Sequence, residues 1–411
     1  MTSLAERLRG VVKPVEQRPV VASQSHDHAA EVLGGTWCEI NGQRFLVVDR
    51  KYGAGHRHGH VAMCDAAPGE RGWSRLNLLS TGERAASGRM LFLDLETTGL
   101  AGGAGTYAFL VGCAWFDGPV FRIRQYFLSS FAAERVLLDA VTGLAADAGA
   151  VITYNGKTFD LPLIETRYLL HRQSTPFAGL PHVDMLHPAR RLWRDEEQEG
   201  GCRLSELENT LLGHEREGDV PGFEIPARYF QFVRSGDARP LEAVLEHNRL
   251  DLLSLALVTA HAARLLEEGP MAARNAREAV GMGRLYERSG HIGEASACYW
   301  RAPELPGDAG SHAEGLRGYA VLARRQRRYR DAADAWRRVL ELRRCPPQIA
   351  REAMEALAVH HEHRQRDLET ARGFALQSLQ IQASAARRQS LQHRIARIDR
   401  KLGHSPPAIL F

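Results

Sequence analysis

Acidic side chains interrupt an apolar run near residue 90. The segment MLFLDLETTG, residues 90–99, has the composition of a buried strand, yet it carries Asp94 and Glu96. Side chains two positions apart point to the same face of a strand, and desolvating two like charges is costly unless a cation lies between them. An exposed strand edge would also explain a lone pair of this kind, but the apolar residues before it and TTG after it favour a functional site.

Two later segments add acidic residues at the boundaries of predicted elements. Asp160 follows the short apolar strand AVITY, residues 150–154, and stands at the first turn of a predicted helix. His247 and Asp251, in HNRLDLLSL, are four residues apart and therefore share one face of a helix. Helices often begin with an acidic residue, and helical His/Asp pairs are common, so neither feature is decisive alone. Their order along the chain favours one composite site.

Oxygen ligands of this kind suit Mg²⁺ or Mn²⁺ better than zinc. Two such cations about 4 Å apart catalyse phosphodiester hydrolysis. The sequence therefore predicts two divalent cations held by Asp94, Glu96, Asp160 and Asp251. Histidine exchanges protons near neutral pH, which makes His247 a candidate acceptor of the proton of the attacking water.

The elements that must position these residues predict an α/β domain with a mixed sheet. Three strand-like runs begin at residue 90 and are joined by hairpins, the second of which turns at Asp117-Gly118-Pro119. A helical pattern at 132–147, the strand at 150–154 and a helix at 159–170 follow, with further helices expected at 203–212, 226–235 and 240–266. Hairpin-joined strands followed by parallel strands with helices are the order of a ribonuclease-H-like sheet. We expect this domain to span residues 89–268.

Two regions precede this domain. Residues 1–34 are polar and are expected to form a disordered or loosely attached arm. Residues 35–88 predict a small β lead-in with a hairpin turn at Asn41-Gly42. His56, His58 and His60 lie there in a Gly-rich loop without a cysteine or carboxylate at ligand spacing, so we interpret them as loop residues rather than as a metal site.

After Gly269 the sequence becomes rich in alanine and arginine. Ala295, Ala332 and Ala371 stand at matching positions of three similar helical segments, which predicts tetratricopeptide-like repeats over residues 270–405. Such repeats form their own core, so a chain ending near Glu268 is expected to fold. Residues 270–411 carry 25 Lys and Arg against 15 Asp and Glu. Only four residues of the whole chain are lysine, a bias typical of a GC-rich genome, so we favour a protein partner for the repeats over nucleic acid.

These motifs resemble the DEDD exonuclease superfamily, and more closely the YprB-like ribonuclease-H-like family. The resemblance covers residues 90–266 and includes GTYAFLVG, YNGKTFDLPL, LHPARRLWR, CRLSELE, DVPGFEIP and HNRLDLLSL. It implies a 3′–5′ exonuclease in which Asp94, Glu96, Asp160 and Asp251 match the four carboxylates and His247 matches the residue that orients or deprotonates water. The spacing H-x-x-x-D departs from the histidine subgroup, which uses H-x-x-x-x-D, and equals that of the tyrosine subgroup.

The resemblance also implies the residues that contact nucleic acid. They belong to the turns beside the carboxylates: Thr97, Thr98, Gly99, Asn155 and Lys157. Asp184, in HVDML, ends another predicted strand and is interpreted as a structural residue. Both DNA and RNA remain candidate substrates. The alternatives are a nuclease that cuts internal sites and an inactive ribonuclease-H-like fold that serves as a binding module, with its repeats recruiting a partner.

Composition excludes several other classes. The chain of 411 residues is 44% hydrophobic and 25% charged, as soluble globular proteins are. No apolar run reaches the roughly 20 residues of a membrane span, and the first residues do not form a signal peptide, so no membrane partner is expected. The six cysteines are scattered, which predicts free thiols and a cytoplasmic protein.

Overall fold

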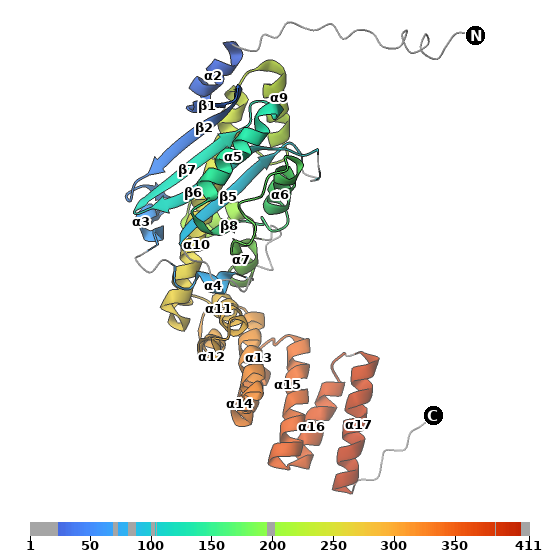
Figure 1. The fold of residues 1–411 in the computed structure, drawn as a ribbon. Coiled ribbons are helices and arrows are strands. Elements are labelled where there is room, and N and C mark those ends of the chain that lie inside the picture. The colour runs from blue at the N-terminus through green and yellow to red at the C-terminus, as the bar shows by residue number, and fades with distance from the viewer. Residues whose placement is uncertain are drawn as a thin grey trace, which may run out of the picture.

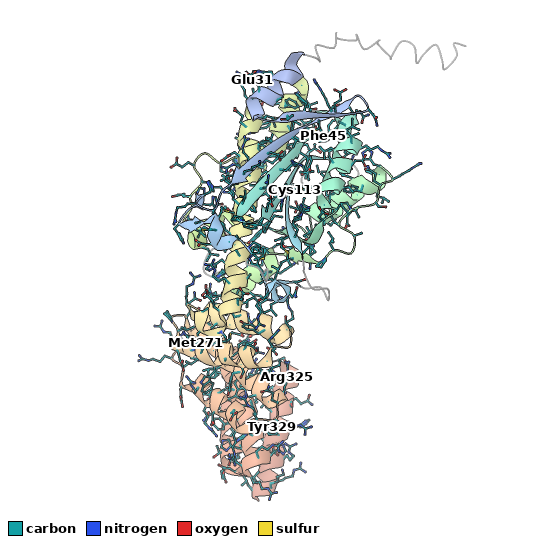
Figure 2. The ribbon with its side chains drawn as sticks, turned by 60° about the vertical axis from the view of Figure 1, so that its left-hand side comes forward. Glu31, Phe45, Cys113, Met271, Arg325 and Tyr329 are labelled. Carbon is teal, nitrogen blue, oxygen red and sulfur yellow. The ribbon has the colours of Figure 1, made fainter. Side chains whose placement is uncertain are left out.

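The computed structural model describes residues 24–68, 73–80, 88–99, 103, 105–194, 202–382 and 384–403. Most of the expected arm (1–23) and the last two residues of the predicted repeats (404–405) lie outside the described residues. An α/β part and a stack of helices follow one another along the long axis of the molecule (Figure 1). In Figure 2, Phe45 and Cys113 lie in the first part, and Arg325 and Tyr329 lie in the second.

The α/β part is built on a seven-stranded mixed sheet with the order β1-β2-β7-β6-β5-β8-β9. Its strands are β1 (Thr36–Ile40), β2 (Gln43–Tyr52), β5 (Arg89–Thr97), β6 (Ala108–Asp117), β7 (Val120–Phe127), β8 (Ala148–Thr153) and β9 (His182–Asp184). Antiparallel hairpins join β5, β6 and β7, whereas β8 is parallel to β5 and β9 is parallel to β8. The predicted fold class is thereby confirmed.

The predicted lead-in is part of this same sheet, because β2 pairs antiparallel with β7 from Leu46 to Tyr52. Residues Gln24–Leu33, which were expected in the arm, form helix α2, and its Ala29 and Leu33 are buried. Apolar residues at these two positions anchor α2 beside the sheet. Short elements complete the segment: β3 (Arg57–His58), β4 (Val61–Ala62), α3 (Met63–Ala66) and α4 (Leu76–Leu79).

Helices cover both faces of the sheet, and the alternation along β5 assigns its residues to one face or the other. Leu91 and Leu93 pack into one apolar core, whereas Phe92 packs into the other, which includes Leu252 and Ala256 of the helix α10 (Arg239–Glu268). The remaining helices of this part are α5 (Glu134–Ala145), α6 (Asp160–Leu170), α7 (Leu186–Leu192), α8 (Leu204–Leu207), the π-helix η2 (Glu208–Leu212), α9 (Ile225–Ser235) and α10 (Arg239–Glu268). Asp94 and Glu96 have the parity of Phe92 and therefore face α10.

The second part consists of helices that pack against their neighbours in sequence. They are α11 (Ala276–Arg288), α12 (Ile292–Arg301), α13 (Ala309–Arg325), α14 (Tyr329–Glu341), α15 (Pro347–His360), α16 (Leu368–Leu379) and α17 (Ala385–Leu402). The matching alanines Ala295, Ala332 and Ala371 are all buried, as close helix contacts require. Assignment to the tetratricopeptide class stays a prediction.

One apolar core continues across the predicted domain boundary near residue 269. It includes Ala189 and Leu192 of α7, Leu266 of α10, and Ala276 and Met282 of α11. A chain ending at Glu268 would expose this core to water, so the structure speaks against the expectation that such a chain folds alone.

Among the described residues, none of the helices combines the length and the apolar character that crossing a bilayer requires. All six cysteines are free thiols, as predicted.

The contact between the two parts can be tested at a glycine. A Cβ atom added to Gly281 of α11 would lie 2.3 Å from the carbonyl oxygen of Arg191 in α7. We expect Gly281→Ala to lower the free energy of unfolding by about 1–3 kcal/mol, because a backbone atom cannot easily move away. Gly373→Ala in α16 is the matched control, since a Cβ there meets nothing within 4 Å. It should stabilise the protein by about 0.5–1 kcal/mol. Urea unfolding followed by circular dichroism measures both; equal effects would contradict this packing.

Candidate active site

Three of the predicted carboxylates converge where β5 ends and α6 begins. Asp94 and Glu96 project from β5, and the backbone N–H of Leu95 donates a hydrogen bond of 3.2 Å to Oδ1 of Asp160 at the start of α6. Asp94, Glu96, Asp160 and His247 line a single cavity of about 340 Å³. The strand and the helix are adjacent because β8, which precedes α6, is the parallel neighbour of β5.

Electrostatics show that the fourth carboxylate belongs to the same group. Burial raises the pKa of Asp94 well above its usual value, and the nearby charges of Asp251, Glu96 and Asp160 raise it further. The pKa of Glu96 is also raised well above its usual value, most by burial and then by the charges of Asp251 and Asp160. The pKa of Asp160 is raised to about 7, mainly by burial. Three buried carboxyl groups with a fourth carboxylate beside them favour protons or a cation in their midst.

An asparagine that the sequence analysis missed holds Asp94 in place. Asn248 of α10 donates through Nδ2 to Oδ2 of Asp94 at 2.7 Å and to its carbonyl oxygen at 3.2 Å. Gln125 of β7 donates to Oδ1 of Asn248 at 2.8 Å. Gly112 lies opposite Asp94 in the sheet, and a Cβ there would lie 2.3 Å from Asn248 Oδ1. A signal was present in the sequence. Gln125 takes the next alternate position after the apolar Phe121 and Ile123 of β7, and Gly112 interrupts the apolar run of β6.

The His247/Asp251 pair lies as its helical spacing predicts, within a second ionic network. Nε2 of His247 lies 3.5 Å from Oδ2 of Asp251, and Nδ1 lies 2.7 Å from Oδ1 of Asp219. Arg216 approaches Asp251 at 2.5 Å, Asp219 at 3.1 Å and Glu208 at 2.6 Å. Asp219 thereby fixes the orientation of the imidazole, and Arg216 offsets part of the negative charge at Asp251. Asp219 and Arg216 were not predicted, because neither lies at a recognisable spacing from the helical pair.

The structure separates the five predicted nucleic-acid contacts into two groups. Thr97, Gly99 and Asn155 line the cavity. Within the part of the chain that the structure describes, Thr98 and Lys157 do not line it. The Thr98 hydroxyl accepts a hydrogen bond of 2.9 Å from the N–H of Tyr107, so this residue shapes the turn after β5. The cavity wall also includes aromatic residues that the sequence analysis missed, and Phe159 among them is 57% exposed.

Asp184 has the structural role expected of it. Its buried carboxylate accepts hydrogen bonds from the backbone N–H groups of Asn155 at 2.7 Å, Lys157 at 3.1 Å and Leu186 at 3.1 Å. Asp184 thus holds the turn between β8 and α6, in which Asn155 has a positive φ of 65°. This turn delivers Asp160 to the cavity.

The chain is similar in sequence to known proteins. Residues 91–263 match the RNase H superfamily, which therefore defines the class of the α/β part. The uncharacterized protein YprB of Bacillus subtilis (strain 168) is 30% identical over 363 residues, which cover 87% of this chain and 86% of YprB. The chain belongs to the YprB-like family of the RNase H superfamily.

A comparison with solved structures finds a family B DNA polymerase of the hyperthermophilic archaeon Pyrobaculum calidifontis. The similarity has a TM-score of 0.34 at 15% sequence identity. It covers 52% of this chain and 29% of the polymerase chain.

The raised pKa of Asp160 predicts how pH affects the metal-free protein. Because its folded-state pKa of about 7 exceeds that of the unfolded chain, its contribution to stability is complete at low pH and is lost as pH rises through about 7. Asp160→Asn is neutral at every pH. It should therefore raise the melting temperature at pH 8 but not at pH 4, in the presence of chelator.

The control for this experiment is Asp147→Asn, which changes an exposed carboxylate. It should leave the difference between the two pH values unaltered. Melting curves of the three proteins at both pH values provide the measurement. If Asp160→Asn gives the same shift at pH 4 and pH 8, the pKa of Asp160 is not raised in the folded protein.

Proposed function

We propose that this protein is a metal-dependent nuclease that hydrolyses phosphodiester bonds. The observation that carries the proposal is the convergence of Asp94, Glu96, Asp160 and Asp251. Burial, and then the repulsion of neighbouring carboxylates, raise the pKa values of the first three. Such repulsion stabilises nothing by itself, and its relief by cations is the usual reason for such a group. Membership of the RNase H superfamily supports the same chemistry.

The donor set fits two cations of the Mg²⁺ or Mn²⁺ type, because the converging ligands are all carboxylate oxygens. Asp94, Glu96, Asp160 and Asp251 would hold them. When bound, such cations make water a better nucleophile and stabilise the leaving oxygen. Asn248 keeps the Asp94 carboxylate in one orientation.

His247 is the proposed acceptor of the proton of the attacking water. It lines the cavity, and its Nδ1 atom is engaged by Asp219, which leaves Nε2 on the side of Asp251 and the carboxylates. An imidazole held in this way keeps one nitrogen available for proton transfer.

The walls of the cavity support a nucleic-acid substrate. The Thr97 hydroxyl, the turn at Gly99 and Asn155 offer polar contacts to a terminal nucleotide, and the exposed ring of Phe159 offers a surface for base stacking. The 3′–5′ exonuclease direction rests on the resemblance to DEDD exonucleases.

The helical repeats remain a proposed surface for a protein partner. Several of their arginines already pair within the chain, as Arg325 does with Glu287 and Arg337 with Asp334. Such pairing leaves less positive charge for phosphate groups.

One observation favours the second candidate, a binding module with little activity. The guanidinium of Arg216 holds Asp251 at 2.5 Å and thereby competes with a cation for this carboxylate. In that case the same cavity binds a nucleic-acid end without cleaving it. The activity assay below separates the two candidates.

Asp94→Asn should abolish hydrolysis of end-labelled DNA and RNA, because it removes a ligand placed among all the other carboxylates. Wild-type activity should require Mg²⁺ or Mn²⁺ and stop with excess chelator. Asp117→Asn, a change at the exposed hairpin between β6 and β7, should retain the wild-type rate. Gel assays on single- and double-stranded substrates provide the measurement. Cleavage that persists in chelator contradicts the metal mechanism, and binding without cleavage by the wild type supports the binding module.

His247→Ala should lower the rate by about 10²- to 10⁴-fold, the usual contribution of a general base. The pH dependence should change as well, because another acceptor must take the proton. Asp219→Asn should have a smaller effect of the same kind, since it only orients the imidazole. Rates measured from pH 6 to pH 9 test this prediction. An unchanged rate and profile in His247→Ala would assign His247 to packing alone.

A further inference from the structure

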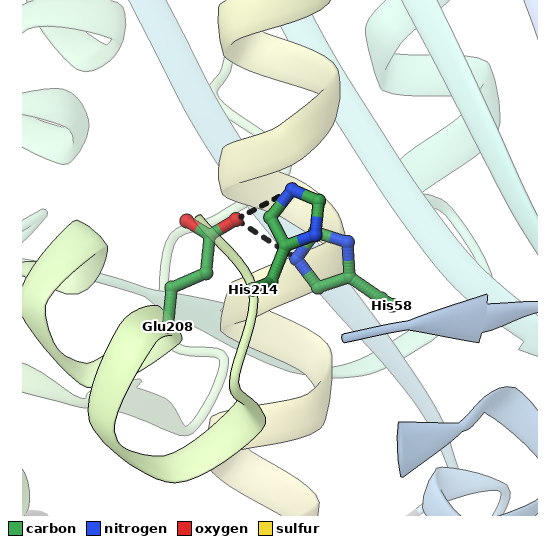
Figure 3. A group of neighbouring side chains, drawn as sticks. All are labelled: His58, Glu208 and His214. Atoms are coloured by element: carbon green, nitrogen blue, oxygen red, sulfur yellow. Dashed lines mark ion pairs between the residues drawn. The ribbon is translucent and has the colours of Figure 1, made fainter. Parts of the chain in front are cut away.

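A second group of potential metal ligands lies apart from the acidic cavity. It consists of His58 in β3, Glu208 at the start of η2 and His214, two residues after η2 ends (Figure 3). His58 and Glu208 are 3% and 0% exposed, respectively, and the side chain of His214 is 28% exposed. His58 was interpreted as a loop residue and His214 was not singled out, yet the fold brings both to one buried carboxylate.

The geometry of the three side chains is that of a preformed ligand set. Oε1 of Glu208 lies 3.0 Å from Nε2 of His58 and 3.5 Å from Nε2 of His214 (Figure 3). The two imidazole rings are stacked with centroids 4.0 Å apart, and the Nε2 atoms of both lie near the same oxygen. Bonds of about 2.0–2.1 Å to a tetrahedral zinc ion place neighbouring ligand atoms about 3.3 Å apart, which these distances bracket.

The buried carboxylate shares its histidine partner with another group. Oε2 of Glu208 is engaged by Arg216 at 2.6 Å, whereas the fully buried Oε1 is approached by Nε2 of His58 and Nε2 of His214. Nε2 of His58 also lies 2.8 Å from the Ser254 hydroxyl, and it carries at most one proton. A cation between Oε1 and the two nitrogens would compensate the buried carboxylate more fully than this shared contact does.

We propose that His58, Glu208 and His214 bind one transition-metal cation of the zinc class. Two imidazole nitrogens and one carboxylate oxygen suit Zn²⁺ and exclude a preference for Mg²⁺, which favours oxygen ligands. Binding replaces the hydrogen bond between His58 and Ser254. A water molecule can complete the coordination from the partly exposed side of His214. The evidence for this site does not depend on the proposed nuclease activity.

The surroundings assign a structural role to this cation. The hairpin of β3 and β4 is docked on the end of η2, where the N–H of His60 donates a hydrogen bond of 2.8 Å to the carbonyl oxygen of Leu212. Gly59, with φ +62°, allows this contact, because a Cβ there would lie 2.0 Å from the same oxygen. The cation would fasten two segments about 150 residues apart. Through Glu208 and Arg216 it would also fix the partner of Asp251.

Zinc binding by the full chain tests this proposal. Protein stripped with chelator and desalted is titrated with Zn²⁺ in excess Mg²⁺, and bound zinc is measured by elemental analysis. Co²⁺ serves as a second probe, because its visible absorption distinguishes four from six ligands. We expect one equivalent of Zn²⁺ in the wild type and a raised melting temperature on loading. The double variant Asp94→Asn/Asp160→Asn should retain the equivalent, which separates this site from the acidic cavity.

His214→Asn removes one ligand at the partly exposed side of the site. It should weaken zinc binding at least about 100-fold, since the loss of even an outer-shell partner costs 10- to 100-fold. His60→Asn is the matched control, because this exposed histidine belongs to the same hairpin but not to the ligand group. Its zinc content should equal that of the wild type.

The proposal is overturned if the wild type binds no zinc in excess Mg²⁺, or if His214→Asn binds zinc as tightly as the wild type. It is also overturned if the equivalent disappears in Asp94→Asn/Asp160→Asn, which would assign the zinc to the acidic cavity. Circular dichroism in chelator establishes that each variant is folded. Should His214→Asn unfold, the Co²⁺ spectrum of the wild type still decides: an octahedral spectrum contradicts coordination by this group.

Discussion

The desolvation of like charges at the end of β5 is the constraint on which the rest of the structure depends. β5 lies inside the sheet between β6 and β8, and its residues Phe92 and Leu93, which precede Asp94, are fully buried. Water therefore cannot fully hydrate Asp94 and Glu96. The protein offsets part of this cost with Asn248 and with the Leu95 N–H that reaches Asp160. The raised pKa values show that the compensation is incomplete without protons or cations.

The helix α10 relates this site to the rest of the molecule. Its first half carries His247, Asn248 and Asp251 to the carboxylates, and Ser254, one turn further on, reaches the histidine cluster. Its last turns share a core with α11 and α12. A 30-residue helix is a stiff element, so its packing against the repeats and its position over β5 are set together. The continuity of this core is the physical reason why the two parts of the chain do not separate cleanly at residue 269.

The sequence by itself determined the features that depend on local periodicity. Alternation along a strand places Asp94 and Glu96 on one face, and the four-residue spacing of a helix places His247 beside Asp251. The order of strands and helices predicted the mixed sheet, since hairpins and crossovers restrict how consecutive elements pair. These predictions need only neighbouring residues, and the backbone geometry that links such residues is the same in every protein.

Only the tertiary structure decided which distant residues meet. Gln125 of β7 contacts Asn248 of α10, and His58 contacts Glu208, about 150 residues further along the chain. No spacing along the chain predicts either contact. His58 was interpreted as a loop residue because no cysteine or carboxylate lies at ligand spacing from it in the sequence. Burial then gives such contacts their meaning: the same carboxylate is unremarkable in water, but inside the protein it requires a partner, and folding alone determines which groups become buried.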